Sequence, residues 1–136
     1  AKGFEVYFMS PKATDSHAKE LARKENSADP QAIPDQVQWI LNDVRTNFHI
    51  RESSRFAGAM FRKISDNLPG SRGVRQAPFA VLAGTEMPAL LLEVGYLTNA
   101  QEAHLLTKES YLNRLADAIS SGLFEFLLQH GAGRVS

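Results

Sequence analysis

The hydrophobic positions near the start of the chain predict a strand followed by a helix. Residues 4–9 read Phe-Glu-Val-Tyr-Phe-Met, and aromatic and β-branched side chains of this kind are typical of a strand. Asp15 then has the position of a helix N-cap, and small or apolar residues recur at helical steps up to about Glu25. These recurring residues are Ala18, Leu21 and Ala22.

The middle of the chain predicts two further helical segments. Two prolines among small and polar residues make residues 26–34 a surface loop, after which Asp35 caps a helix with an apolar face that reaches Val44. The pattern weakens at residues 46–50, where we expect a break or a bend. It resumes at residues 56–64, whose apolar positions fit an amphipathic helix.

Two short apolar runs in the second half predict buried strands. Residues 68–73 are rich in glycine and proline and predict a loop, which leads into a strand at residues 79–82. The second run, residues 89–94, is continuous rather than alternating. This favours a strand that is covered on both faces, as in a parallel sheet.

The end of the chain predicts a short helix and a long one. Asn99 with Glu102 resembles a capping box, and a long amphipathic pattern follows it and ends near Gly131. Strands that alternate with helices predict an α/β fold. We therefore expect part of a mostly parallel sheet flanked by helices.

Composition narrows the classes of function that the chain can have. With 136 residues, of which 43% are hydrophobic and 22% charged, it is typical of one globular domain. Fifteen basic residues balance 15 acidic ones, which argues against nucleic-acid binding, and no apolar run approaches the roughly 20 residues that span a bilayer. The absence of cysteine excludes disulfides and thiolate chemistry, and leaves histidines and carboxylates as the strong metal ligands.

Glu93 is the residue whose position indicates chemistry. It follows an apolar run of alanine and leucine, and a carboxylate is costly to place near a core. Catalytic groups in open α/β sheets lie beyond the carboxyl ends of strands, and Gly95 would let the backbone turn away there. A structural reading stays open, in which a backbone N–H or an arginine satisfies the carboxylate.

Five segments, in the right order, resemble one enzyme family. Residues 87–99, Met-Pro-Ala-Leu-Leu-Leu-Glu-Val-Gly-Tyr-Leu-Thr-Asn, closely resemble the MPAvLvEvGFlSN signature of zinc-dependent N-acetylmuramoyl-L-alanine amidases of bacterial cell walls. Residues 3–10 are similar to the family's GxEvyflS strand, and residues 18–26 to its A..LA..EN helix. Residues 50–57 are similar to its I.eSs.lA segment, and residues 79–82 to its f.VL strand.

The resemblance implies that residues 1–136 are the C-terminal portion of an amidase catalytic domain, without its N-terminal half. Such an enzyme cleaves the amide between N-acetylmuramic acid and the L-alanine of the stem peptide in peptidoglycan. Glu93 falls on the family's catalytic glutamate, which takes a proton from a zinc-bound water and returns it to the leaving amine. The resemblance also implies a periplasmic or extracellular location and, for some members, an activator protein.

Zinc is the implied cofactor, but its ligands are absent from this chain. The family holds the metal with His, Glu and His of its N-terminal half, so we expect the chain to carry the base without the metal site and to be inactive alone. The four histidines show no HxxxH or HxxH spacing that would rebuild a site. His49 is expected to be partly buried and the others to lie at the surface; these are His17, His104 and His130.

Other candidate residues have structural explanations. Ser53 and Ser54 lack a G-x-S-x-G turn and fall in a helix. Trp39 and Phe48 could stack on a sugar, although aromatic residues at helical spacing are more often core. Four arginines could form a stripe toward anionic cell-wall polymer, although a solvated helix face is the stronger interpretation. They are Arg45, Arg51, Arg55 and Arg62.

Two alternatives to a simple catalytic fragment stay open. A non-catalytic module could keep half of the amidase fold for binding. Because half a sheet leaves strand edges and apolar faces uncovered, we expect the isolated chain to self-associate. An amidase that is blocked by an inhibitory helix and released by an activator would need room between residues 26 and 46, and the short loop there favours an unblocked site.

Overall fold

The computed structural model describes residues 2–28 and 44–132, and its strands form a mixed sheet. The central strand is β1 (Phe4–Met9), with β2 (Ser71–Ala77) parallel to it on one side and β3 (Leu91–Glu93) antiparallel to it on the other. The strand order among the described residues is therefore β2-β1-β3.

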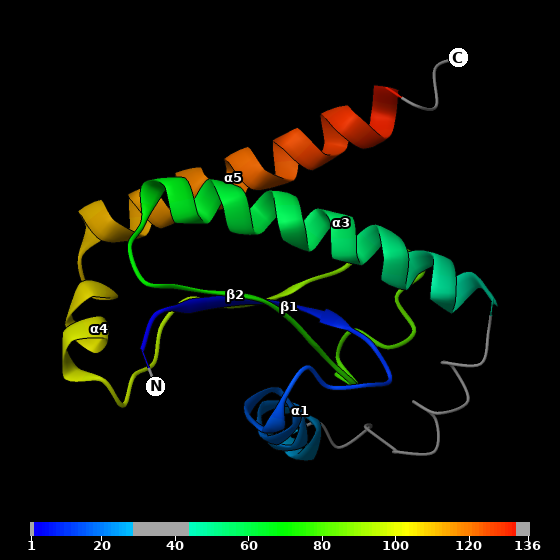
Figure 1. The fold of residues 1–136 in the computed structure, drawn as a ribbon. Helices are drawn as coiled ribbons and strands as arrows, with labels where there is room; N and C mark the ends of the chain where they lie inside the picture. The colour runs from blue at the N-terminus through cyan, green and yellow to red at the C-terminus, as the bar shows by residue number, and fades with distance from the viewer. Residues whose placement is uncertain (1, 29–43, 133–136) are drawn as a thin grey trace.

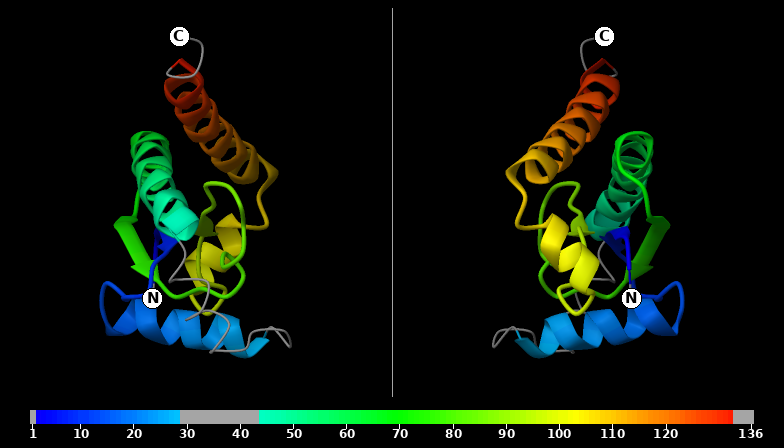
Figure 2. Two further views of the ribbon diagram at one scale, coloured as in Figure 1. Left: turned by 90° about the vertical axis from the view of Figure 1, so that its right-hand side faces the viewer. Right: turned by 90° about the vertical axis from the view of Figure 1, so that its left-hand side faces the viewer.

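Helices cover both faces of this sheet (Figure 1). α3 (Val44–Asn67) and α5 (Glu109–Ala132) lie together on one face, and α1 (Ser16–Ala28) lies on the opposite face (Figure 2). The short helix α4 (Ala100–Leu105) follows β3 and lies near the start of β1 (Figure 1). This arrangement confirms the predicted class, an α/β sheet flanked by helices. None of the helices in the described ranges is long and apolar enough to cross a membrane.

β1 is the core of the molecule because all six of its residues are buried. Its side chains alternate between the two faces, as in any strand. One set packs against α3 and α5 and the other packs toward α1. The first set is Phe4, Val6 and Phe8, and the second contains Tyr7 and Met9.

β3 is also covered on both faces, although its pairing with β1 is antiparallel. Leu92 packs with the cluster under α3 and α5, and Leu91 packs with the cluster under α1. The continuous apolar run correctly indicated cover on both faces. It does not distinguish parallel from antiparallel pairing, because both kinds of strand can be sandwiched between helices.

α3 and α5 approach each other closely at Gly122. A Cβ atom at this position would lie 2.8 Å from Sδ and 3.0 Å from Cα of Met60. Farther along the same helices, the rings of Phe56 and Phe126 stack with centroids 4.5 Å apart. Nδ1 of His130 lies 2.9 Å from a carboxylate oxygen of Glu52, and this ion pair also joins the two helices.

The predicted strand at residues 79–82 is wrong, and the predicted loop at residues 68–73 is correct only for residues 68–70. The strand is β2, which begins at Ser71, and the carbonyl of Phe79 instead accepts turn hydrogen bonds from the N–H groups of Leu82 and Ala83. The apolar side chain at position 79 is explained by packing, since the ring of Phe79 lies edge-on against Tyr7 with ring centroids 5.2 Å apart. The polar residues of β2 concealed the strand from an argument based on apolar runs.

Helix boundaries agree with the predictions at the caps and differ in the middle. Asp15 Oδ1 accepts the N–H of Ala18 at 2.9 Å, as the predicted N-cap requires. α1 continues to Ala28, past the predicted end, because the Asn26 side chain bonds the backbone on both sides of Phe79, at Pro78 O and Ala80 N.

The predicted break near residue 48 is wrong, because α3 is continuous from Val44 to Asn67. Ile50 packs against both core clusters, which holds this weakly patterned turn in the helix. Most of the predicted loop at residues 26–34 and of the predicted helix at residues 35–44 lies outside the described residues.

The contact at Gly122 predicts opposite effects for one substitution at two helical glycines. Gly122→Ala should lower the free energy of unfolding by about 1 kcal/mol, because overpacking against the Met60 backbone exceeds the gain in helix propensity. Gly58→Ala is the matched control: its new methyl would meet only the flexible Arg62 side chain at 3.6 Å, so it should gain about 0.5–1 kcal/mol. Urea unfolding of both variants measures this, and equal effects would contradict the packing argument.

Candidate active site

Two glutamates lie opposite each other on neighbouring strands. Glu93 ends β3, and its partner in the antiparallel ladder is Glu5 of β1. Residues opposite each other in a ladder project from the same face of a sheet. The next partners along the same face, Tyr7 and Leu91, pack in the cluster beneath α1. Both carboxylates therefore project from the α1 face.

Glu93 is half-buried and, within the described part of the chain, its carboxylate has no hydrogen-bond or ion-pair partner. Burial raises the pKa of Glu93, and the negative charges of Glu25 and Glu5 raise it further, against a smaller opposing effect of His17. The structural reading left open by the sequence required an arginine or a backbone N–H to bond Glu93. The described residues supply neither. Within the described ranges, no donor therefore occupies the carboxylate of Glu93.

Glu5 is in the opposite situation, fully buried and surrounded by donors. Its Oε2 accepts hydrogen bonds from the hydroxyls of Tyr7 at 2.6 Å and Tyr96 at 2.9 Å. Nε2 of His17 lies 3.2 Å from the same oxygen. Burial raises the pKa of Glu5, but these three hydrogen bonds together with the His17 charge outweigh it, so the pKa lies below its ordinary value.

Arginines from β2 complete the surroundings of Glu5. Nε of Arg72 lies 3.3 Å and Nε of Arg75 lies 3.5 Å from Oε1 of Glu5. Arg75 also pairs with Asp15, the N-cap of α1, and so connects the sheet to that helix. The donors thus bond Oε2, whereas Oε1 has guanidinium charges beside it but accepts no hydrogen bond from the described residues. Hydrogen bonds and positive charges of this kind favour the ionised form of a buried carboxylate.

The two tyrosines are held as neutral donors. Burial raises the pKa of Tyr7 and of Tyr96, and the nearby charge of Glu5 adds to this, because a phenolate beside a carboxylate is unfavourable. Both hydroxyls therefore keep their protons and donate hydrogen bonds to Glu5.

The turn that follows Glu93 is fixed by a second carboxylate. Oε2 of Glu102 accepts the N–H of Tyr96 at 2.8 Å, and its Oε1 accepts the N–H of Gly3. Asn99 caps α4 as predicted, since its side chain accepts from the N–H groups of Gln101 and Glu102. Glu102 does not complete the predicted capping box, because its carboxylate joins the turn to the start of β1 instead.

The histidines do not meet at a metal site. His17 is not a simple surface residue, because it bonds Glu5, and His130 is paired with Glu52. His104 is exposed, and His49 is half-buried as predicted. In residues 2–28 and 44–132, no three histidine or carboxylate side chains could hold a metal ion together. The described residues therefore do not fit zinc.

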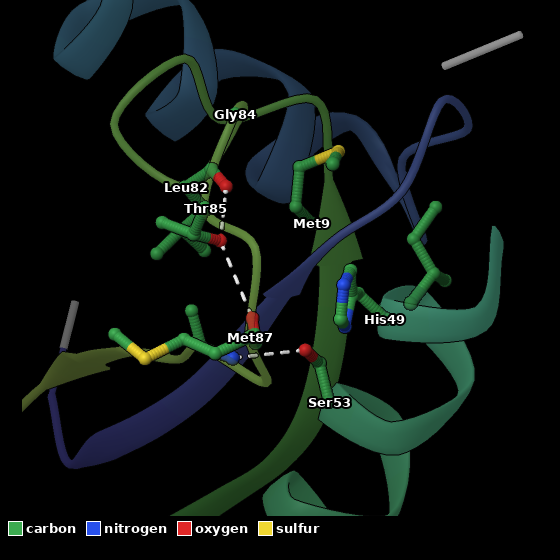
Figure 3. A pocket seen from close by; sticks show the side chains of 9 residues that line it. Met9, His49, Ser53, Leu82, Gly84, Thr85 and Met87 are labelled. Carbon is green, nitrogen blue, oxygen red and sulfur yellow. Dashed lines mark hydrogen bonds between the residues drawn. The ribbon is translucent and has the colours of Figure 1, made fainter. Parts of the chain in front are cut away.

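The remaining candidates lie away from Glu93. A cavity of about 20 Å³, room for about one water molecule, is lined by residues that include His49, Ser53 and Met87 (Figure 3). It lies at the Met9 end of β1, whereas Glu93 pairs near the other end. The Ser53 hydroxyl accepts the N–H of Ala89 at 2.9 Å, which is a structural role.

The prediction for the four arginines agrees with the structure where it is described, and the prediction for Phe48 does not. Arg51, Arg55 and Arg62 are exposed on α3, as a solvated face requires, and the side chain of Arg45 is outside the described set. Phe48 is 51% exposed, so its assignment to the core is wrong. Trp39 lies outside the described residues.

Sequence reasoning missed Glu5 and its partners, although one signal was present. Glu5 is the single charged residue in the apolar strand at residues 4–9, which is the same anomaly that singled out Glu93. Tyr96, Arg72 and Arg75 carry no comparable signal, because residues of these types are common in turns and on edge strands.

Comparisons with known proteins agree on one family. The sequence profile of the N-acetylmuramoyl-L-alanine amidase family matches residues 1–125. N-acetylmuramoyl-L-alanine amidase AmiC of Neisseria meningitidis is 32% identical over 135 residues, which cover 93% of this chain and 32% of AmiC. N-acetylmuramoyl-L-alanine amidase AmiA of Escherichia coli is 30% identical over 134 residues, which cover 93% of this chain and 46% of AmiA.

A solved structure is similar over the same region. The catalytic domain of CwlV, an N-acetylmuramoyl-L-alanine amidase from Bacillus (Paenibacillus) polymyxa var. colistinus, matches with a TM-score of 0.57 at 27% identity. The match covers 93% of this chain and 49% of the CwlV chain. The chain thus spans less than half the length of each of these relatives.

The lowered pKa of Glu5 predicts how the stability of the fold depends on pH. Glu5 contributes stability above its ordinary pKa of 4.5, and this contribution is lost as the pH falls through the lower pKa of the folded state. Glu5→Gln should therefore flatten the decline of unfolding free energy below about pH 4.5. Urea unfolding between pH 2 and 7 measures it. Glu20→Gln, which removes an exposed carboxylate paired with Arg23, is the control and should change the slope less.

Proposed function

The chain belongs to the N-acetylmuramoyl-L-alanine amidase family, and on that premise we propose that it is the part of a peptidoglycan amidase that carries the proton acceptor. The reaction is hydrolysis of the amide between N-acetylmuramic acid and the L-alanine of the stem peptide. The observation that carries the proposal is Glu93: it ends a strand inside the family signature, and its carboxylate has no partner among the described residues.

Glu93 has the properties that a general base needs. A base must be ionised at the working pH and must gain by taking a proton, and a raised pKa strengthens its affinity for that proton. Burial and the charges of Glu25 and Glu5 raise the pKa of Glu93 in this way. We assign to Glu93 the removal of a proton from the attacking water and its delivery to the leaving amine of L-alanine.

In this proposal, zinc would be held by residues that are not part of the 136-residue chain. The described histidines and carboxylates do not fit a zinc site, so we assign no step of the reaction to a metal held by them. The ligands are expected in the upstream half of the domain, and the relatives are long enough to contain it. On this proposal the 136-residue chain alone is inactive.

The setting of the enzyme follows from its substrate. Peptidoglycan lies outside the cytoplasmic membrane, so we place the protein in the periplasm or at the cell wall, where such enzymes act as autolysins and in cell separation. Regulation by an activator protein would act through the segment between residues 26 and 46, most of which lies outside the described residues.

Replacement of Glu93 tests the proposal. In the complete domain, formed by this chain and the upstream half, Glu93→Gln should lower the release of stem peptides from peptidoglycan by about 10²–10⁴-fold, because the amide cannot accept the proton. Glu86→Gln, which changes an exposed carboxylate in the loop before β3, is the control and should keep normal activity. Normal activity in Glu93→Gln would exclude Glu93 as the base.

A second candidate function, a self-associating module, is supported by exposed apolar surface. β3 lies at one edge of the described sheet, and the last turns of α5 expose large apolar side chains. Apolar patches of this kind are typical of surfaces that another chain covers. These side chains are Leu123, Phe124, Leu127 and Leu128.

The isolated 136-residue chain should therefore form dimers or larger species at micromolar concentration. Phe124→Glu should shift sedimentation toward the monomer, because a charge would be buried in the contact. Asn113→Glu adds the same charge at an exposed polar position of α5 and should leave the association unchanged. A cooperatively melting monomer for the unmodified chain would contradict this prediction.

A further inference from the structure

The turn that follows Glu93 is held from two directions at Tyr96. The hydroxyl of Tyr96 donates to Oε2 of Glu5 at 2.9 Å, and its N–H donates to Oε2 of Glu102 at 2.8 Å. Glu102 also accepts the N–H of Gly3, just before β1. Both anchors of the turn therefore lead to β1, the most deeply buried strand of the molecule.

The fold does not require a charged residue at position 5. The removal of an ionised carboxylate from water is expensive, and a well-packed apolar residue in its place is often neutral or stabilising. The neighbours of Glu5 on β1 are apolar and buried, and an apolar residue would continue that pattern. The carboxylate must therefore be explained by the groups that it binds.

The groups that bind Glu5 are the donors on the α1 face of the sheet. Tyr7, Tyr96 and His17 converge on Oε2, and the two β2 arginines approach Oε1. Glu93 lies one strand away on the same face and receives none of these donors. Glu5 thus gathers the donors that would otherwise neutralise or bond the neighbouring carboxylate.

We propose that Glu5 is a positioning residue for Glu93. By holding the Tyr96 hydroxyl it fixes the turn directly after Glu93, and by engaging His17 and the arginines it keeps these groups of the described structure away from the Glu93 carboxylate. This role rests on the proposed function, in which Glu93 is the base. Glu5 acts through Tyr96 and does not itself touch the substrate.

Two tyrosine variants separate positioning from a merely structural contribution. Tyr96→Phe removes the hydroxyl that joins the turn after Glu93 to Oε2 of Glu5, whereas Tyr111→Phe removes a tyrosine hydroxyl on α5, on the other face of the sheet. In the complete domain, Tyr96→Phe should lower kcat by about tenfold with little change in KM, because a small displacement of a catalytic group is costly. Tyr111→Phe should leave kcat within about twofold, because the Tyr111 ring packs in the cluster under α3 and α5 and not beside Glu5.

The coupling between Glu5 and Tyr96 is the second measurement. If Glu5 acts through Tyr96, the double variant Glu5→Gln with Tyr96→Phe should lose little more kcat than the more damaging single variant. Additive losses would overturn the proposal, and so would equal losses of kcat in Tyr111→Phe and Tyr96→Phe. Should Glu5→Gln fail to fold, the comparison of the two tyrosine variants decides alone.

A spectroscopic readout in the 136-residue chain does not depend on activity. The ¹³C resonance of the Glu93 side-chain carboxyl should shift in Tyr96→Phe and keep its position in Tyr111→Phe. An unchanged resonance in Tyr96→Phe would overturn the proposal. The two hypotheses fail separately: an active Glu93→Gln variant removes the proposed function, whereas an inactive Glu93→Gln with a fully active Tyr96→Phe removes only the role of Glu5.

Discussion

The buried carboxylate of Glu5 is the interaction on which the rest of the site depends. It lies in the central strand with no exposed surface and is contacted from the strand itself, from β2, from α1 and from the turn after β3. A buried ion is tolerable only when hydrogen bonds and opposite charges compensate it, so the elements that supply these groups must keep their relative positions. The contacts that compensate this one charge therefore connect the sheet, α1 and the β3–α4 turn.

The apolar core supplies the rigid frame around this charge. β1 is sandwiched between the α1 side and the α3–α5 side, and the close approach at Gly122 brings the two long helices together above it. The frame explains why the unusual charge can be placed at all. Hydrophobic burial on both faces stabilises the strand, and the polar network uses a single position on one face of it.

Glu5 and Glu93 show how one sheet gives two carboxylates different properties. They are partners in the same ladder, yet Glu5 receives donors of that face and has a lowered pKa, whereas Glu93 receives none from the described residues and has a raised pKa. When the surroundings of two titratable groups shift their pKa values in opposite directions, the groups are usually assigned different roles. This contrast supports the two proposed roles, a positioning residue at Glu5 and a proton acceptor at Glu93.

The sequence by itself determined the features that depend on neighbours along the chain. Helix caps at Asp15 and Asn99, the buried strand at residues 4–9 and the family signature around Glu93 could all be read from local pattern. Features set by distant contacts could not be read in this way. β2 is rich in polar residues because its arginines turn toward a carboxylate on another strand, and α3 stays helical through residue 48 because Ile50 packs in both clusters.

Only the tertiary structure decided which carboxylate is bonded and which is free. The sequence shows Glu5 and Glu93 alike, each a single charge at an apolar strand. The difference arises because the antiparallel pairing of β1 with β3 places them side by side, while the described residues of β2 and α1 bring donors to Glu5 and none to Glu93. Hydrogen bonds between strands and helices far apart in sequence depend on how the chain folds back on itself, and a local pattern of residues does not contain that information.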